Sequence, residues 1–198
     1  MKKVLVSVLF LAAVLSLSHS ASGQADSNNL NNLLFGSNSP NDQLIEAAKT
    51  GDIAAVQHLL AKGANIEARD GLFGWTSLMW AAGQGKTAVV KMLIERGANI
   101  NARDVSGITA MMLAASHDMS EVVTLLLDKG ASIETKTDSG GTPLMWAARN
   151  GSTEVVRLLL ARGANIDAKD NKGETALMKA ISKGNTDVVK LLREHGAH

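Results

Sequence analysis

The chain has 198 residues, with 20 Lys and Arg against 19 Asp and Glu, and it contains no Cys and no Tyr. Without residues 1–25, which hold two Lys and no acid, 18 basic residues face 19 acidic ones; this near-neutral charge argues against a dedicated nucleic-acid binder. The absence of Cys excludes disulfides, thiolate metal sites and a Cys nucleophile, while 45% apolar and 20% charged residues are typical of a folded protein.

Residues 1–25 have the pattern of a secretory signal peptide. Lys2 and Lys3 form a positive start, Val4 to Ser18 is an apolar run of 15 residues, and small residues follow. The run is shorter than the ~20 residues that a helix needs to span a bilayer, which favours a signal peptide over an uncleaved membrane anchor. We expect cleavage between Ser20 and Ala25 and a periplasmic mature protein without a membrane span; an extracellular protein is the alternative.

Residues 26–40 are rich in Asn and Ser. These side chains compete with helix formation because they bond to the nearby backbone. We therefore predict a flexible linker, in which Leu30, Leu33, Leu34 and Phe35 could pack on the following domain as a short helical turn.

From residue 41 the sequence repeats every 33 residues. Gly-Ala pairs begin at 63, 97, 130, 163 and 196, Thr-x-x-Met tetrads at 76, 109, 142 and 175, and Val-Val pairs at 89, 122, 155 and 188. Three ladders share this spacing, apart from one extra residue between 63 and 97, and such a period indicates a solenoid. We count five units: 41–70, 71–104, 105–137, 138–170 and 171–198.

The unit at 138–170 shows the elements expected in each repeat. Residues 138–141 have turn chemistry, Thr142 can cap a first helix, and Gly151 ends that helix. Glu154 lies at the start of a second helix, where an acid is favourable, and Gly163 takes the left-handed position after its end. Neither helix is long enough to be stable alone, so stability must come from packing between neighbouring units.

The third unit departs from this pattern at Asp118, which stands where the other units have Gly. A left-handed backbone is unfavourable for a residue with a side chain, although Asp tolerates it better than most. The sequence therefore predicts that the stack opens locally most readily at the third unit.

At these residues the chain resembles the ankyrin-repeat family, over roughly residues 41–198. The 33-residue period, Thr-Pro-Leu at 142–144 and Gly-Ala-Asn-Ile at 63, 97 and 163 carry the resemblance. It implies an all-α solenoid of about five helix-turn-helix units with β-turn fingers. It also implies a concave side, formed by first helices and fingers, that family members usually use to bind protein partners. Some small periplasmic proteins that resemble this one are linked to peroxide resistance beside a catalase.

The family's tetrad Thr-Pro-Leu-His ends here in Met in every unit that carries it, at Met79, Met112, Met145 and Met178. We interpret these residues as flexible apolar packing. These Met residues are not expected to share a soft metal ion, because equivalent atoms in neighbouring units lie about 8–10 Å apart. A sacrificial oxidant sink is an alternative hypothesis, which burial of the four side chains would weaken.

The first finger is apolar where the others are polar, because it contains Leu72, Phe73 and Trp75. Exposed apolar patches mark interaction sites, and Trp is enriched in binding hot spots. The alternative is that these residues cover the first unit or pack on Phe35.

A second candidate surface follows the first helices. The position after each Met holds Trp80, Leu113, Trp146 and then Lys179, and it shares a helix side with the position four residues later. We expect an apolar floor with polar groups around it; packing against the neighbouring unit is the alternative. The candidate partner-binding residues are Leu72, Phe73, Trp75, Trp80, Gln84, Leu113, His117, Trp146, Arg149 and Asn150.

The sequence contains no constellation typical of catalysis. It has no paired-His motif and no phosphate loop, and carboxylates such as Asp104 and Asp170 are expected to serve turns. The scattered histidines are expected at the surface: His58, His117, His195 and His198. We expect a monomeric, non-catalytic module without cofactor or metal, which binds an unidentified protein and no nucleic acid. An adaptor released outside the cell to act on a host protein is the second hypothesis.

Overall fold

The computed structural model of the chain describes residues 39–198, which contain ten helices packed in five pairs. The first helices of the pairs are α3 (Pro40–Thr50), α5 (Ser77–Gly83), α7 (Ala110–Ser116), α9 (Pro143–Asn150) and α11 (Ala176–Lys183). The second helices are α4 (Ile53–Ala61), α6 (Thr87–Glu95), α8 (Ser120–Asp128), α10 (Thr153–Ala161) and α12 (Thr186–Glu194). This arrangement confirms the predicted all-α solenoid.

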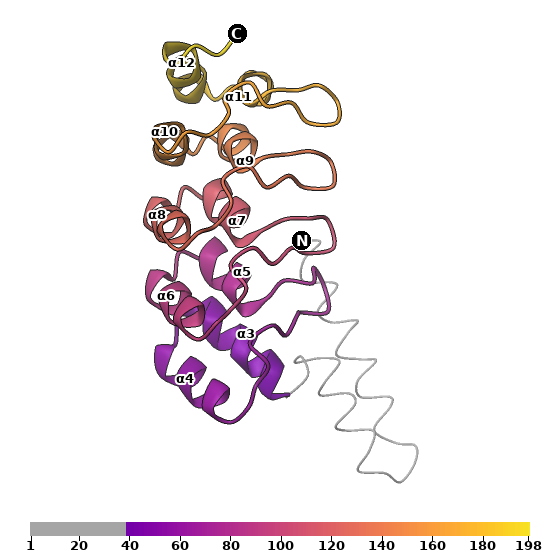
Figure 1. Ribbon diagram of the computed structural model, residues 1–198, viewed down its shortest axis with the longest axis vertical. Coiled ribbons are helices and arrows are strands. Elements are labelled where there is room, and N and C mark those ends of the chain that lie inside the picture. The colour runs from indigo at the N-terminus through magenta and orange to yellow at the C-terminus, as the bar shows by residue number, and fades with distance from the viewer. Residues whose placement is uncertain (1–38) are drawn as a thin grey trace, which may run out of the picture. The chain divides into compact units, whose positions relative to one another are not determined.

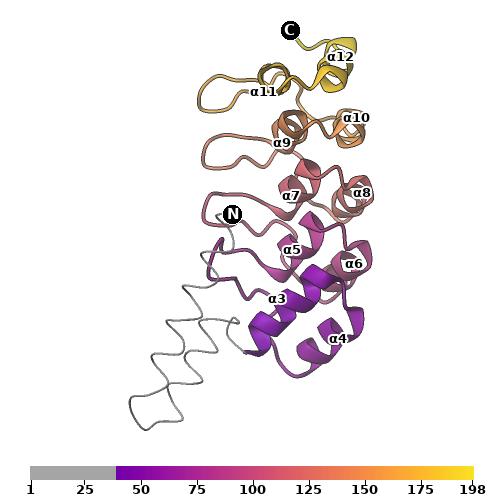
Figure 2. The ribbon, with the colours of Figure 1, turned by 180° about the vertical axis from the view of Figure 1, so that it is seen from behind.

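The pairs stack in two columns, with the fingers projecting on the side of the first helices (Figure 1). Each first helix packs on the next first helix, and each second helix on the next second helix. Seen from behind, the first helices form a row between the fingers and the second helices (Figure 2). The predicted signal peptide at 1–25 and most of the predicted linker lie outside the described residues.

The first helix begins earlier than predicted. Pro40 is its first residue, and the Ser39 side chain caps it by accepting a hydrogen bond from the Asp42 N–H at 3.2 Å. Pro is favourable there because the first N–H of a helix needs no partner within the helix. Ser39 and Pro40 therefore belong to the repeat domain and not to the linker predicted over 26–40.

Threonine caps and glycine stops set the bounds of the helices. Thr142 illustrates the caps, since its hydroxyl accepts a hydrogen bond from the Met145 N–H at 3.4 Å. The same bond recurs in the second, third and fifth units. Gly151 ends α9 with a φ of 76°, and Gly163 follows α10 with a φ of 84°. Both turn positions predicted for this unit are confirmed.

The core is aliphatic, and methionine belongs to it wherever a neighbouring unit covers it. Met79, Met112 and Met145 are at most 1% exposed. Met178 is 48% exposed, because no unit follows the fifth one within the described residues. The interpretation of these residues as packing therefore holds for three of them, and the fourth is open to solvent.

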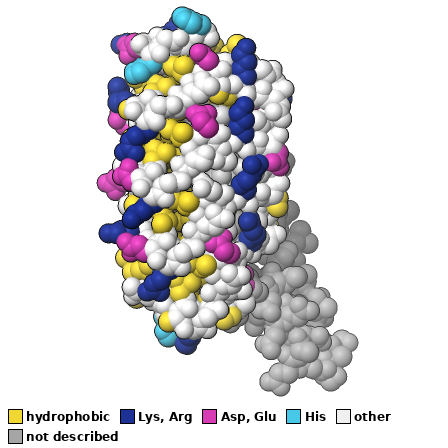
Figure 3. Space-filling view, viewed as in Figure 1, with side chains coloured by type: hydrophobic (Ala, Val, Ile, Leu, Met, Phe, Trp, Pro, Cys, Tyr) yellow, Lys and Arg dark blue, Asp and Glu magenta, His cyan; other side chains and the backbone are white. Residues whose placement is uncertain are grey.

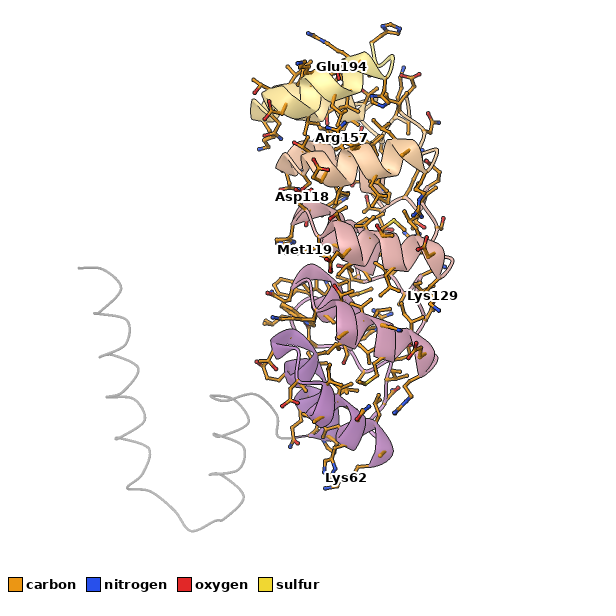
Figure 4. The ribbon with its side chains drawn as sticks, turned by 90° about the vertical axis from the view of Figure 1, so that its left-hand side faces the viewer. Lys62, Asp118, Met119, Lys129, Arg157 and Glu194 are labelled. Carbon is orange, nitrogen blue, oxygen red and sulfur yellow. The ribbon has the colours of Figure 1, made fainter. Side chains whose placement is uncertain are left out.

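Asp118 has the predicted left-handed backbone, with a φ of 57°. Its carboxylate accepts a hydrogen bond from the N–H of Val155 in the next unit at 3.1 Å. Ser152, the N-cap residue of α10, makes no side-chain cap bond, so Asp118 supplies this helix with an acceptor from the preceding unit. Figure 4 shows Asp118 where the chain passes between α7 and α8. The strained residue thus joins two units.

Side chains also tie the fingers together. Lys and Arg recur along the face of the stack drawn in Figure 3. Arg69 donates to the Arg103 carbonyl at 2.8 Å, and Arg103 pairs with Asp138 at 2.9 Å. Backbone bonds continue the connection, for example from the Asn171 N–H to the Ser139 carbonyl at 3.0 Å. The fingers are therefore held in register from one unit to the next.

Candidate functional site

Three aromatic rings form one cluster where the first finger meets α5. The ring centroids of Trp75 and Trp80 lie 4.6 Å apart, and Phe73 lies 4.9 Å from Trp75 and 6.2 Å from Trp80. The Lys49 ammonium, from α3, lies 4.4 Å from the centre of the Trp80 ring, within the range of a cation–π interaction. The cluster therefore connects the first unit to the second.

The tip of this finger stays exposed. Leu72 is 85% exposed and Phe73 is 46% exposed, and Val105 on the second finger is 79% exposed. Val105 lies against Gly74, because a Cβ added at Gly74 would come within 3.2 Å of the valine methyl. We call Leu72, Phe73 and Val105 the apolar finger patch. Val105 was not predicted as part of this surface, although an apolar residue at the tip of a turn was a signal for it.

The predicted floor of Trp80, Leu113 and Trp146 does not form. Leu113 is only 3% exposed, because α5 packs closely on it: a Cβ at Gly83 would lie 3.5 Å from the Leu113 Cβ. Within residues 39–198 the ring contacts of Trp80 are with Phe73 and Trp75, not with Trp146. Leu113 therefore offers no surface to a partner, and the expectation for it is wrong.

The other expected residues lie at the surface near the ends of the first helices. Trp146 is half-buried, and the side chains beyond it are exposed. The exposed members are Gln84, His117, Arg149 and Asn150. Cations also occur in the last turns of α3, α9 and α11, at Lys49, Arg149 and Lys183. Such cations are favourable at helix ends because of the negative end of the helix dipole.

A carboxylate organises three of the four fingers. One oxygen of Asp70, Asp104 and Asp170 accepts backbone N–H bonds within its own finger. The second oxygen accepts a side-chain donor. Trp80 Nε1 donates to Asp70 at 2.6 Å, Trp75 Nε1 to Asp104 at 2.9 Å, and Lys179 Nζ to Asp170 at 2.6 Å. The predicted turn role of Asp104 and Asp170 is confirmed, and both Trp75 and Trp80 have a structural role.

These contacts keep the finger groups charged. Burial opposes ionisation of Asp70, but hydrogen bonds from the finger backbone and the Trp80 indole outweigh it and lower its pKa. The hydrogen bond from Lys179 lowers the pKa of Asp170 despite partial burial. Burial works against the charge of Lys179, yet its bonds to Asp170 and Glu174 raise its pKa. The ion pair between Lys179 and Asp170 thus stabilises the last finger.

The family model for ankyrin repeats (3 copies) matches residues 44–137 and 132–198, which is most of the chain. The protein belongs to the ankyrin-repeat family. Ankyrin repeats are generally protein–protein interaction modules, and proteins built from them are typically non-catalytic. No curated protein matches the chain.

Residues 39–198 also bear on two other kinds of site, a membrane span and a metal centre. None of the helices in this part of the chain has both the length and the apolar character needed to cross a membrane. In the same residues no three His, Cys, Asp or Glu side chains come together in a way that could hold a metal ion.

Proposed function

We propose that this protein is an exported, non-catalytic binding module that holds a partner protein against its fingers and first helices. The observation that carries the proposal is the apolar finger patch, which remains exposed although the finger beneath it is tightly bonded. Large apolar side chains held on a rigid support bind at a low entropic cost, because little order is lost on association. The exposed polar groups at the ends of the first helices give such a partner further contacts.

Export to the periplasm is part of the proposal, and residues 1–25 support it by their signal-peptide pattern. Cell fractionation with an antibody against the chain tests it. We expect a shortened chain, cut between residues 20 and 25, in the periplasmic fraction. Recovery of the uncut chain in the cytoplasm would contradict export, and recovery in the medium would favour an adaptor that acts outside the cell.

Substitution of the apolar finger patch tests the binding role. We expect Leu72→Ser with Val105→Ser to abolish capture of the partner from periplasmic extract while the thermal unfolding midpoint stays nearly unchanged, because both side chains are largely exposed and neither belongs to the aromatic cluster. Ile53→Ser is the matched control, since Ile53 is 40% exposed but lies at the start of α4, away from the fingers. Unchanged capture by the double variant would refute the proposed surface.

Trp75 and Trp80 are unsuitable for this test. Each indole N–H bonds a finger carboxylate, so its removal would leave that carboxylate without a donor and loosen the finger. Loss of binding in such variants would not separate a contact with the partner from a change in the fold.

A further inference from the structure

Trp146 differs from the other two tryptophans in what its indole N–H contacts. Trp75 and Trp80 donate to Asp104 and Asp70, whereas the Trp146 indole has no acceptor within residues 39–198. Ser77 Oγ is the one buried side-chain polar atom in this part of the chain that lacks a partner. The Trp146 N–H is therefore open to solvent, not sealed in the core.

Two substitutions within the repeat pattern explain this difference. Thr137 stands where the other fingers have Asp70, Asp104 and Asp170, and its hydroxyl is engaged by the Gly141 N–H at 2.9 Å and by Ser139 at 3.0 Å. The finger of the fourth unit thus supplies no carboxylate to the tryptophan beside it.

Gly141 is the second substitution. It stands where the other units have the larger residues Trp75, Ile108 and Glu174. Its φ is not in the left-handed region, so the backbone does not require glycine there. A Cβ would lie 3.2 Å from both Thr137 Oγ1 and Trp146 Nε1. The missing side chain therefore leaves the polar edge of the indole uncovered.

The surroundings of Trp146 favour an anion. Arg149 lies three residues further along the same helix, hence on a neighbouring part of its surface, and it is exposed. Helices α5, α7, α9 and α11 contain no Asp or Glu, whereas α6, α8, α10 and α12 contain six. A carboxylate approaching Trp146 along the row of first helices meets an Arg and no acidic side chain of these helices. Asp170 lies against the finger beside Trp146, since a Cβ at Gly140 would come within 3.0 Å of its Cα, but its carboxylate is paired with Lys179 at 2.6 Å.

We propose that the Trp146 indole N–H binds a carboxylate from the partner, namely an Asp or Glu side chain in an acidic segment, with Arg149 as its cationic neighbour. The partner would supply at the fourth unit the group that Asp70 supplies to Trp80 within the chain. This inference rests on the proposed binding function and adds the chemistry of the partner. Bonds with an ionised acceptor are the strong ones, so a single carboxylate adds both affinity and register.

An NMR titration tests the site directly. The chain has three Trp, so the ¹⁵N-labelled protein gives three indole N–H signals, and Trp146→Phe identifies one of them. The probe is the peptide acetyl-Glu-Glu-amide at constant ionic strength. We expect a saturable shift of the Trp146 signal and none of the Trp75 and Trp80 signals, whose donors are already occupied. An unmoved Trp146 signal, or equal shifts of all three, would overturn the proposal.

Thr137→Asp provides the decisive variant. It restores the carboxylate that the other fingers have. This carboxylate should accept the Trp146 indole N–H bond within the chain, so the Trp146 signal should no longer shift when the peptide is added. Thr137→Ser is the matched control, because it keeps the hydroxyl and adds no charge. Circular dichroism checks that both variants are folded. A Thr137→Asp protein that is folded and binds the peptide as the wild type does would refute the site.

The two proposals can fail separately. If wild type and Thr137→Asp capture the same partner equally well while the apolar finger patch is required, the binding function stands and the carboxylate site is wrong. If the wild type captures no partner, the binding function is wrong, and the indole titration still decides whether Trp146 takes a carboxylate.

Discussion

At the scale of single residues, the tryptophans show how one side chain can serve both the fold and a surface. Trp75 and Trp80 each present a half-buried ring beside Phe73 and send an indole N–H to a finger carboxylate. Their size and place in the repeat indicated binding anchors. Their acceptors could not be predicted from the sequence, because Asp104 and Trp75 are 29 residues apart and meet only through the stacking of two fingers.

Asp118 gives a test at one backbone position. We expect Asp118→Ala to lower the free energy of unfolding by about 1–2 kcal/mol, because it removes the cap on Val155 and leaves a side chain in a left-handed conformation. Urea denaturation measures the change. In Asp118→Gly the relief of strain offsets the lost cap, so the free energy should stay close to that of the wild type. Equal stability of the Ala variant and the wild type would show that the cap contributes nothing, and equal stability of the Ala and Gly variants would show that the backbone strain contributes nothing.

Methionine exposure makes a second prediction. Limited treatment of the folded protein with hydrogen peroxide should oxidise Met178 and spare Met79, Met112 and Met145, because only Met178 is substantially exposed among these four. Peptide mapping by mass spectrometry reads out each site. Uniform oxidation of the four in the folded protein would contradict the packing described above and would revive the hypothesis of an oxidant sink.

The charged pair of the last finger predicts how stability depends on pH. The pKa of Asp170 is lowered from its ordinary value of 3.8, so its contribution is present above that pH and is lost as the pH falls through the lowered pKa. The pKa of Lys179 is raised from 10.5, so its contribution is present below that pH and is lost as the pH rises through the raised pKa.

Lys179→Met removes the pair and tests the direction in which stability changes with pH. Its unfolding midpoint should fall at neutral pH, and its decline below about pH 4 should be shallower than that of the wild type, because Asp170 then retains only its backbone donors. Lys190→Met is the control, since Lys190 is 78% exposed and lies 3.9 Å from Glu194. A variant with the acid profile of the wild type would show that the pair contributes nothing.

At the scale of elements, the helices and turns could be predicted because their signals are local. Gly stops after the second helices and apolar stripes recur in all five units, and Thr caps recur in four of them, so the repeat supports each prediction several times. The start of α3 was missed, because the Asn and Ser around it suggested a linker while Ser39 and Pro40 also form a good helix start. The Thr-x-x-Met tetrad does not occur in the first unit, so the period gave no help there.

Gly163 tests the turn that follows each second helix. We expect Gly163→Val to destabilise the protein by about 1–2 kcal/mol, because its φ of 84° is unfavourable for a β-branched residue although no atom within 4 Å obstructs the side chain. Gly71→Val is the matched control: it also has open space around it, but its φ is outside the left-handed region. Similar unfolding midpoints of the two variants would contradict the argument from backbone strain.

At the scale of the whole molecule, the sequence predicted the solenoid and the fingers, but only part of the candidate site. The exposed tip at Leu72 and Phe73 was expected, whereas burial of Leu113 was not. Whether a first-helix side chain is exposed depends on how closely the next unit approaches, and this distance is set by small residues such as Gly83. The period identifies equivalent positions; the packing between units decides which of them reach solvent.

Site-specific photo-crosslinking tests most directly whether the fingers and first helices form the docking surface. A photoreactive residue would be placed at position 72 on the first finger, at 150 at the end of α9, and at 157 on α10, where Figure 4 shows Arg157 on the column of second helices. We expect one and the same partner adduct from 72 and 150, and none from 157. An adduct from 157 alone would place the partner on the second helices and contradict the account.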